Sequence, residues 1–441
     1  MQELIIAIET APSMGAMMLA AWQLARLLTV KLVEEVLTEQ AQRKTKWPRC
    51  EKCGTRLESK GFIERQLTGL IGTVRWKRRV GRCPNSCEIG QVAPLDAKLG
   101  LVPNQRSSVD LKRAACALSV FVPFEVTAVL LRLLTEVVVS PGAIWNWVQE
   151  AGQEAMTRLQ NQLEALERGE VPGVEEMEAA VASLPLLMGA DGVMVPFRPN
   201  DGRPNGRTIW REIKVGVLAR LSCRVSRTGK PVSHLVQRRL VAVLGSVDDL
   251  EPRLWLEARR QGILSAEMVV WLCDGGRGFW RLFRNRFAGH AMGILDFYHA
   301  AQNLWKGARV WLDGRTREAR QWFVTARRQL RRGEADRVMS DIAAALNLEG
   351  LPPSARKTLE NLYAYLEAHR DHINYARFKE LGLPIGSGMV ESACKWLIQQ
   401  RFKGVGMRWS EDGFKHLLHL RLAWVNNRFD TLFVLGLFPN S

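Results

Sequence analysis

Five apolar runs of strand length lie between residues 184 and 313, and their order constrains the fold more than any other feature. The first three runs follow one another directly, and a helical stretch follows each of the last two. They occupy residues 186–197, 209–221, 233–244, 268–274 and 291–297. Strands in succession, followed by strand–helix alternation, indicate a mixed α/β layer. We therefore predict an α/β fold for this part of the chain.

Three acidic residues accompany this pattern. Asp191 and Asp274 each follow an apolar stretch and precede a glycine, so we expect both side chains at exposed strand ends. Glu391 opens a predicted helix, with Ser387 as its N-cap. Carboxylate clusters suit Mg²⁺, or Mn²⁺, and two ions about 3.5–4 Å apart promote phosphodiester chemistry. The three side chains must converge for this interpretation to hold.

An ordinary structural role is the alternative for each acid taken alone. Aspartate beside glycine is a common turn residue or cap, and glutamate in a first helical turn often only faces the helix dipole. Convergence of all three distinguishes a site from these roles.

The charge balance indicates a polyanionic partner. The chain has 441 residues, 47% of them hydrophobic, which is enough for several domains. Lysine and arginine number 62 against 45 acidic residues, a net charge of +17. Phosphate contacts and counterion release would use such an excess, although the balance names no activity.

The N-terminal residues 1–44 are predicted to form a helical segment. Residues 11–28 are apolar but include Arg26, and Glu3 replaces a basic leader, so we expect neither a membrane span nor a secretory signal. Residues 15–39 are then a candidate oligomer contact. Eight cysteines scattered over a long chain favour a reducing compartment, here the cytoplasm.

Two cysteine pairs predict a zinc-ribbon-like module over residues 45–100. Cys50 and Cys53 form the first pair, and Cys83 and Cys87 form the second, with hairpin-like runs between them. Four thiolates around structural Zn²⁺ would stabilise a segment too small for its own core. The gap between the pairs is long and the second pair has an extra residue, so four unconnected thiols are the alternative. The other cysteines are expected in apolar cores: Cys116, Cys223, Cys273 and Cys394.

The second hairpin run is strongly basic. It carries Arg75, Lys77, Arg78 and Arg79, with Trp76 among them. Cations along one strand suit a DNA backbone, and a solvated edge strand kept from pairing by its charge is an equal alternative.

Residues 101–160 resemble a helix-turn-helix DNA-binding domain in their spacing. A helix is predicted over residues 124–134, and Ser140 before Pro141 is the start signal of the next. The second helix of such a motif enters the major groove, which makes Asn146 and Gln149 candidate base contacts. Many helical hairpins bind no DNA.

The remaining boundaries follow from composition. Residues 161–183 are acidic and aperiodic and predict a linker. Residues 184–313 and 381–441 are predicted as two parts of one core, and arginine-rich residues 314–380 as an all-helical insertion between them.

Residues 386–422, with the stretches around Asp191 and Asp274, resemble the DDE transposases of bacterial insertion sequences. The similarity is greatest to the ISKra group, with kinship to the Mutator-like and hAT-like superfamily, and it covers essentially the whole chain. It implies an RNase H-like catalytic core interrupted by a helical insertion, with Asp191, Asp274 and Glu391 as catalytic metal ligands. Asp296 and His299 resemble the superfamily's Asp-x-x-His motif, and they are expected to support the site.

Cations and aromatic residues downstream of Glu391 are further candidate DNA contacts. The set is Lys395, Arg401, Lys403, Arg408 and Trp409. Cations would hold flanking phosphates, and an aromatic ring could stack on an unpaired base. Trp396 lies at helical spacing in an apolar stripe and is expected in the core.

These features predict an insertion-sequence transposase. The protein would bind terminal inverted repeats and target DNA, both double-stranded, and catalyse Mg²⁺-dependent strand cleavage and strand transfer. Two DNA ends must meet, so a dimer or larger assembly is expected, in the bacterial cytoplasm at the nucleoid and with no membrane partner. An RNase H-like structure-specific nuclease that joins no strands, and a DNA-binding regulator without catalysis, are the alternatives.

Overall fold

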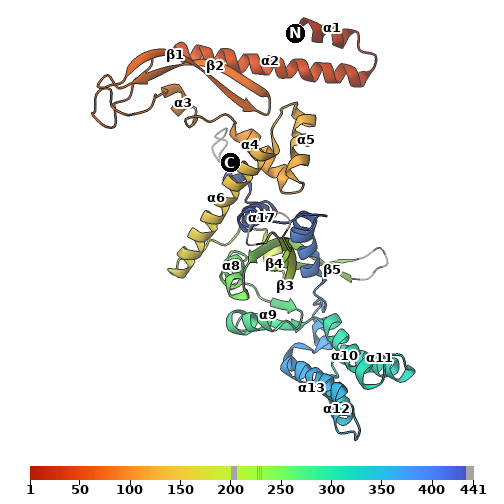
Figure 1. Ribbon diagram of the computed structural model, residues 1–441. Helices are drawn as coiled ribbons and strands as arrows, with labels where there is room; N and C mark the ends of the chain where they lie inside the picture. Colours follow the sequence, from red (N-terminus) through yellow and green to blue (C-terminus); the bar gives the residue numbers. More distant parts are fainter. Residues whose placement is uncertain (200–205, 226, 228, 230, 434–441) are drawn as a thin grey trace. The chain divides into compact units, whose positions relative to one another are not determined.

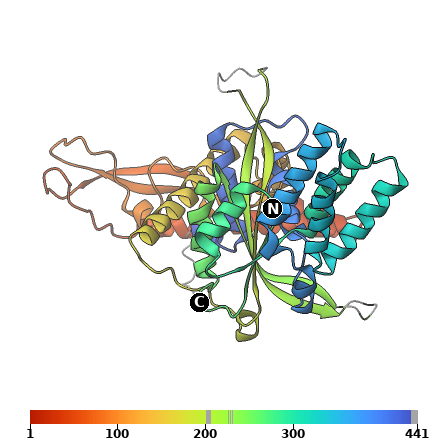
Figure 2. The ribbon, with the colours of Figure 1, turned by 90° about the horizontal axis from the view of Figure 1, so that it is seen from below.

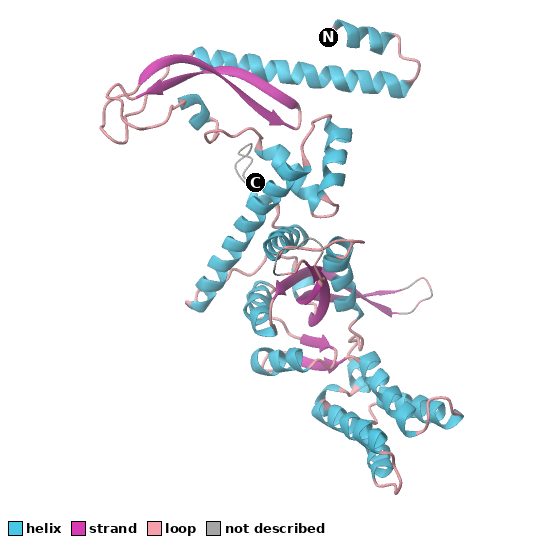
Figure 3. Cartoon of the chain, viewed as in Figure 1, coloured by secondary structure: helices cyan, strands magenta, loops and turns pink. Residues whose placement is uncertain are grey.

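The computed structural model describes residues 1–199, 206–225, 227, 229 and 231–433. The chain forms two compact units. Residues 1–151, with the described residues 430–433, form the first unit, and residues 152–429 form the second. Figure 1 labels the elements of both, and Figure 3 separates helices from strands.

The first unit begins with helices and a β-hairpin. Helices α1 (Gln2–Glu9) and α2 (Met14–Gln42) precede the antiparallel strands β1 (Glu58–Gly69) and β2 (Gly72–Arg82). In β2, Val74, Trp76 and Val80 are buried, and Arg75 and Lys77 between them are exposed. The predicted alternation is confirmed, and Trp76 is buried rather than placed among the exposed cations.

Helix α2 covers the free edge of β2. The backbone N–H of Arg75 donates to Glu34 Oε1 over 2.9 Å, and a Cβ on Gly72 would lie 3.5 Å from Val30. A strand edge covered in this way does not present free donors for pairing with another chain.

Three further helices begin in the first unit after the short α3 (Pro94–Lys98), and the last of them runs on into the second unit. They are α4 (Val109–Ser119), α5 (Phe124–Thr135) and α6 (Pro141–Glu167). The Ser140 hydroxyl accepts from the N–H of Ala143 over 3.2 Å, which confirms the predicted helix start. Glu136 ends α5 in the left-handed conformation, and its carboxylate pairs with Arg26 of α2.

The segment predicted as a linker from residue 161 is structured. Helix α6 continues to Glu167, within the acidic sequence. Beyond it, the Glu175 carboxylate receives hydrogen bonds from Arg239, Gln261 and Arg428. The segment after α6, which includes α7 (Ala179–Ala182), is therefore held within the second unit by this carboxylate.

The second unit is built on a five-stranded sheet of order β5–β4–β3–β6–β7. Strands β3, β4 and β5 form an antiparallel meander, and β6 and β7 continue the sheet in parallel to β3. The bounds are β3 (Leu186–Phe197), β4 (Ile209–Val225), β5 (Pro231–Leu244), β6 (Val269–Cys273) and β7 (Met292–Leu295). Each of the five predicted strands is present.

Helices lie on both faces of this sheet. A Cβ on Gly216 of β4 would lie 2.8 Å from Leu254 of α8 (Val247–Arg260), which places α8 on one face. A Cβ on Gly189 of β3 would lie 2.8 Å from Val390 of α15 (Gly388–Ala393), on the other. Our sequence analysis missed α8, although Ser246 and Asp249 form a capping box at its start.

The other helices of the second unit follow the strands. After β6 come α9 (Arg277–Leu282) and the π-helix η1 (Phe283–Phe287), and α10 (Phe297–Trp311) follows β7. Past α15, the π-helix η3 (Cys394–Gln399), α16 (Gln400–Phe402) and α17 (Glu411–Val425) complete the unit, and the short η4 (Asp430–Leu432) follows them in the first unit.

The elements described between residues 314 and 380 are all helical. They are α11 (Arg317–Arg331), α12 (Ala335–Leu346), α13 (Pro353–Ala368), η2 (Arg370–His372) and α14 (Tyr375–Glu380). Figures 1 and 2 show α11, α12 and α13 beside α10, and a Cβ on Gly307 of α10 would lie 2.7 Å from Leu362 of α13. The insertion therefore shares its apolar interior with the helix that follows β7.

Candidate functional site: three carboxylates around one sheet

Asp191 lies in the middle of β3, where we expected a strand end. It is opposite Val215 of β4, and β3 runs on to Phe197. On its other side, β3 pairs with β6 only as far as Met188. Because β6 is much shorter than β3, the backbone edge of β3 at Asp191 has no strand beside it on that side. Asp191 thus gains the accessibility expected of a strand end while lying inside a strand.

Asp274 follows the last residue of β6, as predicted. Its Oδ1 accepts the N–H of Gly276 over 3.0 Å, which fixes the turn after the strand. Its backbone carbonyl accepts the indole N–H of Trp280 over 2.6 Å. Two hydrogen bonds therefore set the position of this residue.

Glu391 lies in α15, on the face of the sheet to which Asp191 belongs. Alternate residues of a strand face the same side, and Gly189, two residues before Asp191, contacts α15. Ser387 precedes the helix as predicted, but its hydroxyl makes no capping bond. It donates to Asp296 Oδ2 over 2.6 Å, a hydrogen bond strengthened by the negative charge of its acceptor.

The three acids act on one another electrostatically. Burial raises the pKa of Asp191, and the negative charges of Asp274 and Glu391 raise it further. The N–H of Gly192 and the imidazole of His299 oppose this increase. Like charges gathered at a half-buried place favour a bound cation.

The carboxylate oxygens are spread more widely than a closed single-ion site. Among the described residues, only the four cysteines bring three or more such ligand atoms within 4.8 Å of one another. The structure therefore brings the three acids into electrostatic range of one another without closing them into a single ligand group.

Asp296 follows β7 and connects the β6–β7 side of the sheet to the segment that carries Glu391. Its backbone N–H donates to Cys273 O over 2.9 Å, and its side chain accepts from Ser387. It also caps α10 through the N–H of His299 over 2.8 Å. These donors hold the pKa of Asp296 at about 2, although burial opposes them.

His299 is partly exposed beside these acids. Its Nδ1 lies 3.4 Å from Asp296 Oδ1, and this contact raises its pKa against the effect of burial. The charges of Asp274 and Glu391 act in the same direction. Protonated imidazole is therefore favoured at the edge of the carboxylate cluster.

The helical insertion contacts the turn after Asp274, a feature that our sequence analysis missed. A Cβ on Gly275 would lie 2.3 Å from the Tyr365 ring of α13. Rings of His369 and His372 pack on Trp280 with centroids 4.6 and 4.5 Å away. The small residues next to Asp274 were the only signal of this contact in the sequence. Two residues that lie far apart in the chain share no local sequence pattern that could predict their contact.

The cations downstream of Glu391 fall into two groups. Lys395 and Lys403 are exposed, as a DNA contact requires. Arg401 is buried, with its guanidinium 5.3 Å from the Trp409 ring, and Arg408 donates to Gly206 O over 2.9 Å. The predicted DNA contact by Arg401 is therefore wrong for this conformation, since α16 turns its side chain inward.

The two tryptophans of this stretch exchange their expected roles. Trp409 donates its indole N–H to Phe402 O over 3.0 Å and packs on the Phe402 ring, so it stabilises the segment. Trp396, expected in the core, is 39% exposed. The π-helix η3 adds a residue to the turn and moves Trp396 off the buried stripe.

The four cysteines converge in the first unit. Their Sγ atoms all lie within 4.8 Å of one another, and Cys53 Sγ is 3.4 Å from Cys83 Sγ. Tetrahedral zinc with bonds of about 2.3 Å places thiolates about 3.8 Å apart. Thr55 lowers the pKa of Cys53 to about 6, whereas Cys53 and Cys83 raise that of Cys87 to about 12. The sulfur set fits Zn²⁺, which would stabilise all four as thiolates.

The basic residues of β2 differ in their accessibility. Arg75 and Lys77 are exposed. Arg78 donates to Asp96 Oδ2 over 3.0 Å, in an ion pair that Arg65 also joins. The Arg79 guanidinium lies 4.9 Å from the Phe62 ring. Arg78 thus stabilises the hairpin and is not available to DNA in this conformation.

The two residues of α6 that were predicted to contact the DNA major groove also differ in their exposure. Asn146 is exposed in the first turns of the helix, and Gln149 is half-buried. Both lie in the first unit, together with the β-hairpin.

Helix α2 is long and apolar enough to cross a membrane, by length and composition alone. A signal sequence or an interaction helix satisfies the same criterion. Arg26 faces the first unit, where it pairs with Glu136, so the charge that interrupts the apolar sequence is not on the exposed face.

The fold and the site define a mixed α/β protein with a four-cysteine cluster. No protein-family model and no curated protein matches the chain. Among solved structures it is similar to the "Drosophila P element transposase strand transfer complex", with 10% identity over 76% of this chain and 83% of that one, at a TM-score of 0.26. A similarity of this extent defines neither the fold family nor the activity.

Proposed function

We propose that the protein is a DDE transposase of the ISKra group, with an RNase H-like core. The observation that carries the proposal is the placement of Asp191, Asp274 and Glu391 on three elements around one sheet, where their charges act on one another. The strand order, with an antiparallel meander continued by two parallel strands, supports the same assignment.

The carboxylates would hold Mg²⁺ or Mn²⁺ ions. These ions would supply positive charge to the phosphate and to the attacking and leaving oxygens. Asp296 would keep the segment before Glu391 in place, and protonated His299 would attract the scissile phosphate. Such chemistry depends mainly on positioning and charge.

The first unit would bind the terminal inverted repeats. Arg75 and Lys77 are exposed for phosphates, and Asn146 is exposed for a base edge. A zinc ion on the four thiolates would fix the end of the hairpin that carries these cations. In the second unit, Lys395 and Lys403 would hold the strand near the site.

Two DNA ends must meet for transposition, so at least two copies of the chain would assemble. The protein would act on the nucleoid in a bacterial cytoplasm, on element ends and target DNA, in two stages. Strand hydrolysis at each end would come first, and attack of the freed 3′-OH on the target would follow.

The test uses the full chain, Mg²⁺ and duplex DNA taken from both sides of its reading frame. Cleavage at the ends and strand-transfer joints, both lost in Asp191→Asn while DNA binding persists, would support the proposal. Undiminished cutting by Asp191→Ala would overturn it. Cleavage with no joints on several targets would assign a nuclease, and metal-independent binding without cleavage a regulator.

A further inference from the structure

A groove of about 760 Å³ lies beside α15, between that helix and the edge strand β5. Ser392, the residue after Glu391, lines it on the helix side together with Lys395 and Trp396. Arg238 and His234 line it from β5. One wall of the groove is therefore continuous with the segment that carries Glu391.

The lining matches an aromatic anion. None of its residues is acidic, and the side chains of Lys395 and Arg238 are both exposed. Trp396 is 39% exposed, and Arg421 supports it from behind by donating to its carbonyl over 2.6 Å. Nδ1 of His234 is buried and has no hydrogen-bond partner among the described residues. A flat side chain and two cations are thus presented together on the surface of the groove.

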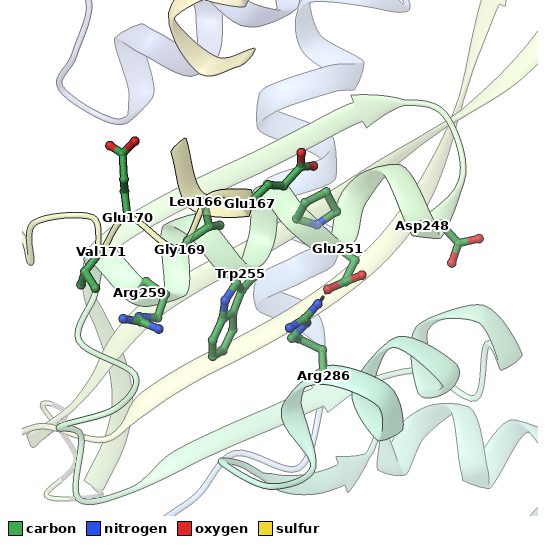
Figure 4. A pocket seen from close by; sticks show the side chains of 11 residues that line it. Leu166, Glu167, Gly169, Glu170, Val171, Asp248, Glu251, Trp255, Arg259 and Arg286 are labelled. Atoms are coloured by element: carbon green, nitrogen blue, oxygen red, sulfur yellow. Dashed lines mark hydrogen bonds and ion pairs between the residues drawn. The ribbon is translucent and has the colours of Figure 1, made fainter. Parts of the chain in front are cut away.

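A second cavity of the same unit provides a contrast. It measures about 430 Å³ and also contains an indole, that of the partly buried Trp255 (Figure 4). Glu167, Glu170, Asp248 and Glu251 surround it, and Glu251 neutralises Arg286. The acidic side chains of that cavity would repel a phosphate. An aromatic residue in a cavity is therefore not enough by itself to identify a site for an aromatic anion.

We propose that the groove beside α15 holds one unpaired nucleotide of the DNA strand next to the phosphate under attack, an inference that rests on the proposed function. The base lies on Trp396, and Lys395 and Arg238 hold the phosphates on either side of it. The volume is that of a small-molecule site, about 300–1,000 Å³, and is too small for a double helix.

The location of the groove gives it a role in the reaction. Opening of the duplex beside the cut would expose a base, and stacking of that base holds the strand without reading its sequence. We therefore expect the site to tolerate any base and to prefer strands that are already open at the cut.

Photocrosslinking tests the occupant directly. The probe is a single-stranded oligothymidylate with one 5-iododeoxyuridine, irradiated with the full chain and mapped by mass spectrometry. The expected crosslink is on Trp396, and it should persist with Asp191→Asn, which removes catalysis but leaves the groove. Crosslinks confined to other residues would overturn the proposal. If Trp396 is crosslinked but the protein cuts no DNA, the assignment of the groove stands and the proposed transposase function is rejected.

Affinity for the same oligonucleotide tests the contribution of each side chain. Trp396→Leu should weaken binding about tenfold, and Trp396→Phe should restore most of it, because a stacked base contributes energy of that size. Lys395→Gln and Arg238→Gln should each reduce the slope of log affinity against log salt by about 0.7. Lys357→Gln, an exposed cation of the insertion, should leave the slope unchanged. Equal slopes in all three variants would refute the phosphate contacts.

Discussion

At the scale of single residues, Asp296 shows how one carboxylate can organise a site without serving as a ligand. It accepts one hydrogen bond from the backbone N–H of His299 over 2.8 Å and another from the hydroxyl of Ser387 over 2.6 Å. These two donors lie far apart in the sequence. Asp296 is almost fully buried. These donors stabilise the negative charge of the Asp296 carboxylate. The charged carboxylate in turn holds the two donors in place.

Asp296→Asn should lower the free energy of unfolding by about 2 kcal/mol at neutral pH, because charge-assisted hydrogen bonds are lost. The folded pKa of about 2 lies below the ordinary value of 3.8. This stabilisation is therefore complete above about pH 4 and is lost as the pH falls toward 2. Urea titrations should show the full difference between variant and parent at pH 6 and a smaller one at pH 3, because a folded pKa of about 2 leaves this carboxylate mostly ionised at pH 3. An equal difference at both pH values would contradict the assignment.

The cysteine cluster makes a second prediction at this scale. Cys53→Ser should abolish a stoichiometric zinc content, because three thiolates and a hydroxyl bind Zn²⁺ far more weakly than four thiolates. Elemental analysis of the purified chain measures the metal directly. The exposed Cys223→Ser is the matched control and should retain it. Zinc kept by Cys53→Ser would exclude the four-thiolate site.

At the scale of elements, the insertion is a structural support for the turn that bears Asp274. Tyr365 of α13 lies against Gly275, and His369 and His372 lie against Trp280, which bonds the Asp274 carbonyl. Burial keeps the pKa of His369 near 4, so this imidazole packs as a neutral ring. The insertion thus fixes a residue of the site through packing.

Gly275→Ala should reduce DNA cleavage about a hundredfold, the effect expected when a reacting group moves by about 1 Å. A Cβ there would lie 2.3 Å from the Tyr365 ring, so either the ring or the turn must shift. The readouts are the cleavage rate and the DNA affinity, of which only the first should change. Gly289→Ala, where a Cβ meets nothing within 4 Å, is the matched control. A full cleavage rate in Gly275→Ala would show that the contact does not position Asp274.

At the scale of the whole molecule, α2 carries an apolar stripe that the described residues leave uncovered. Met18, Trp22 and Leu32 are 66%, 53% and 61% exposed. The stripe repeats at alternating intervals of four and three residues, the spacing of a coiled coil. Its positions are Met18, Trp22, Ala25, Thr29, Leu32 and Val36.

We expect this stripe to be covered by a second copy of the chain in the assembly that the proposed reaction requires. The double change Trp22→Glu and Leu32→Glu should convert the dimer into a monomer, because two charges on each helix would enter the interface. Light scattering after size-exclusion chromatography measures the mass, and Thr38→Glu is the control on the same helix. A monomeric parent chain that floats with lipid vesicles would show instead that α2 binds membranes.

The sequence by itself determined many of the elements. Apolar periodicity placed the five strands, the Ser140 cap placed the start of α6, and paired cysteines identified the thiol cluster. These features are local, because pattern and capping act within a few residues. The sequence also identified Asp191, Asp274 and Glu391 as candidate metal ligands. It did not show where their side chains lie relative to one another.

The tertiary structure alone decided which side chains meet. It placed Asp191 inside a strand whose edge is free only because β6 is short, turned Arg401 inward, and exposed Trp396 through a π-helix. It also brought α13 against the turn of Asp274. Such outcomes depend on strand lengths, helix register and contacts between distant segments. They are set by packing over the whole unit, which no short stretch of sequence encodes.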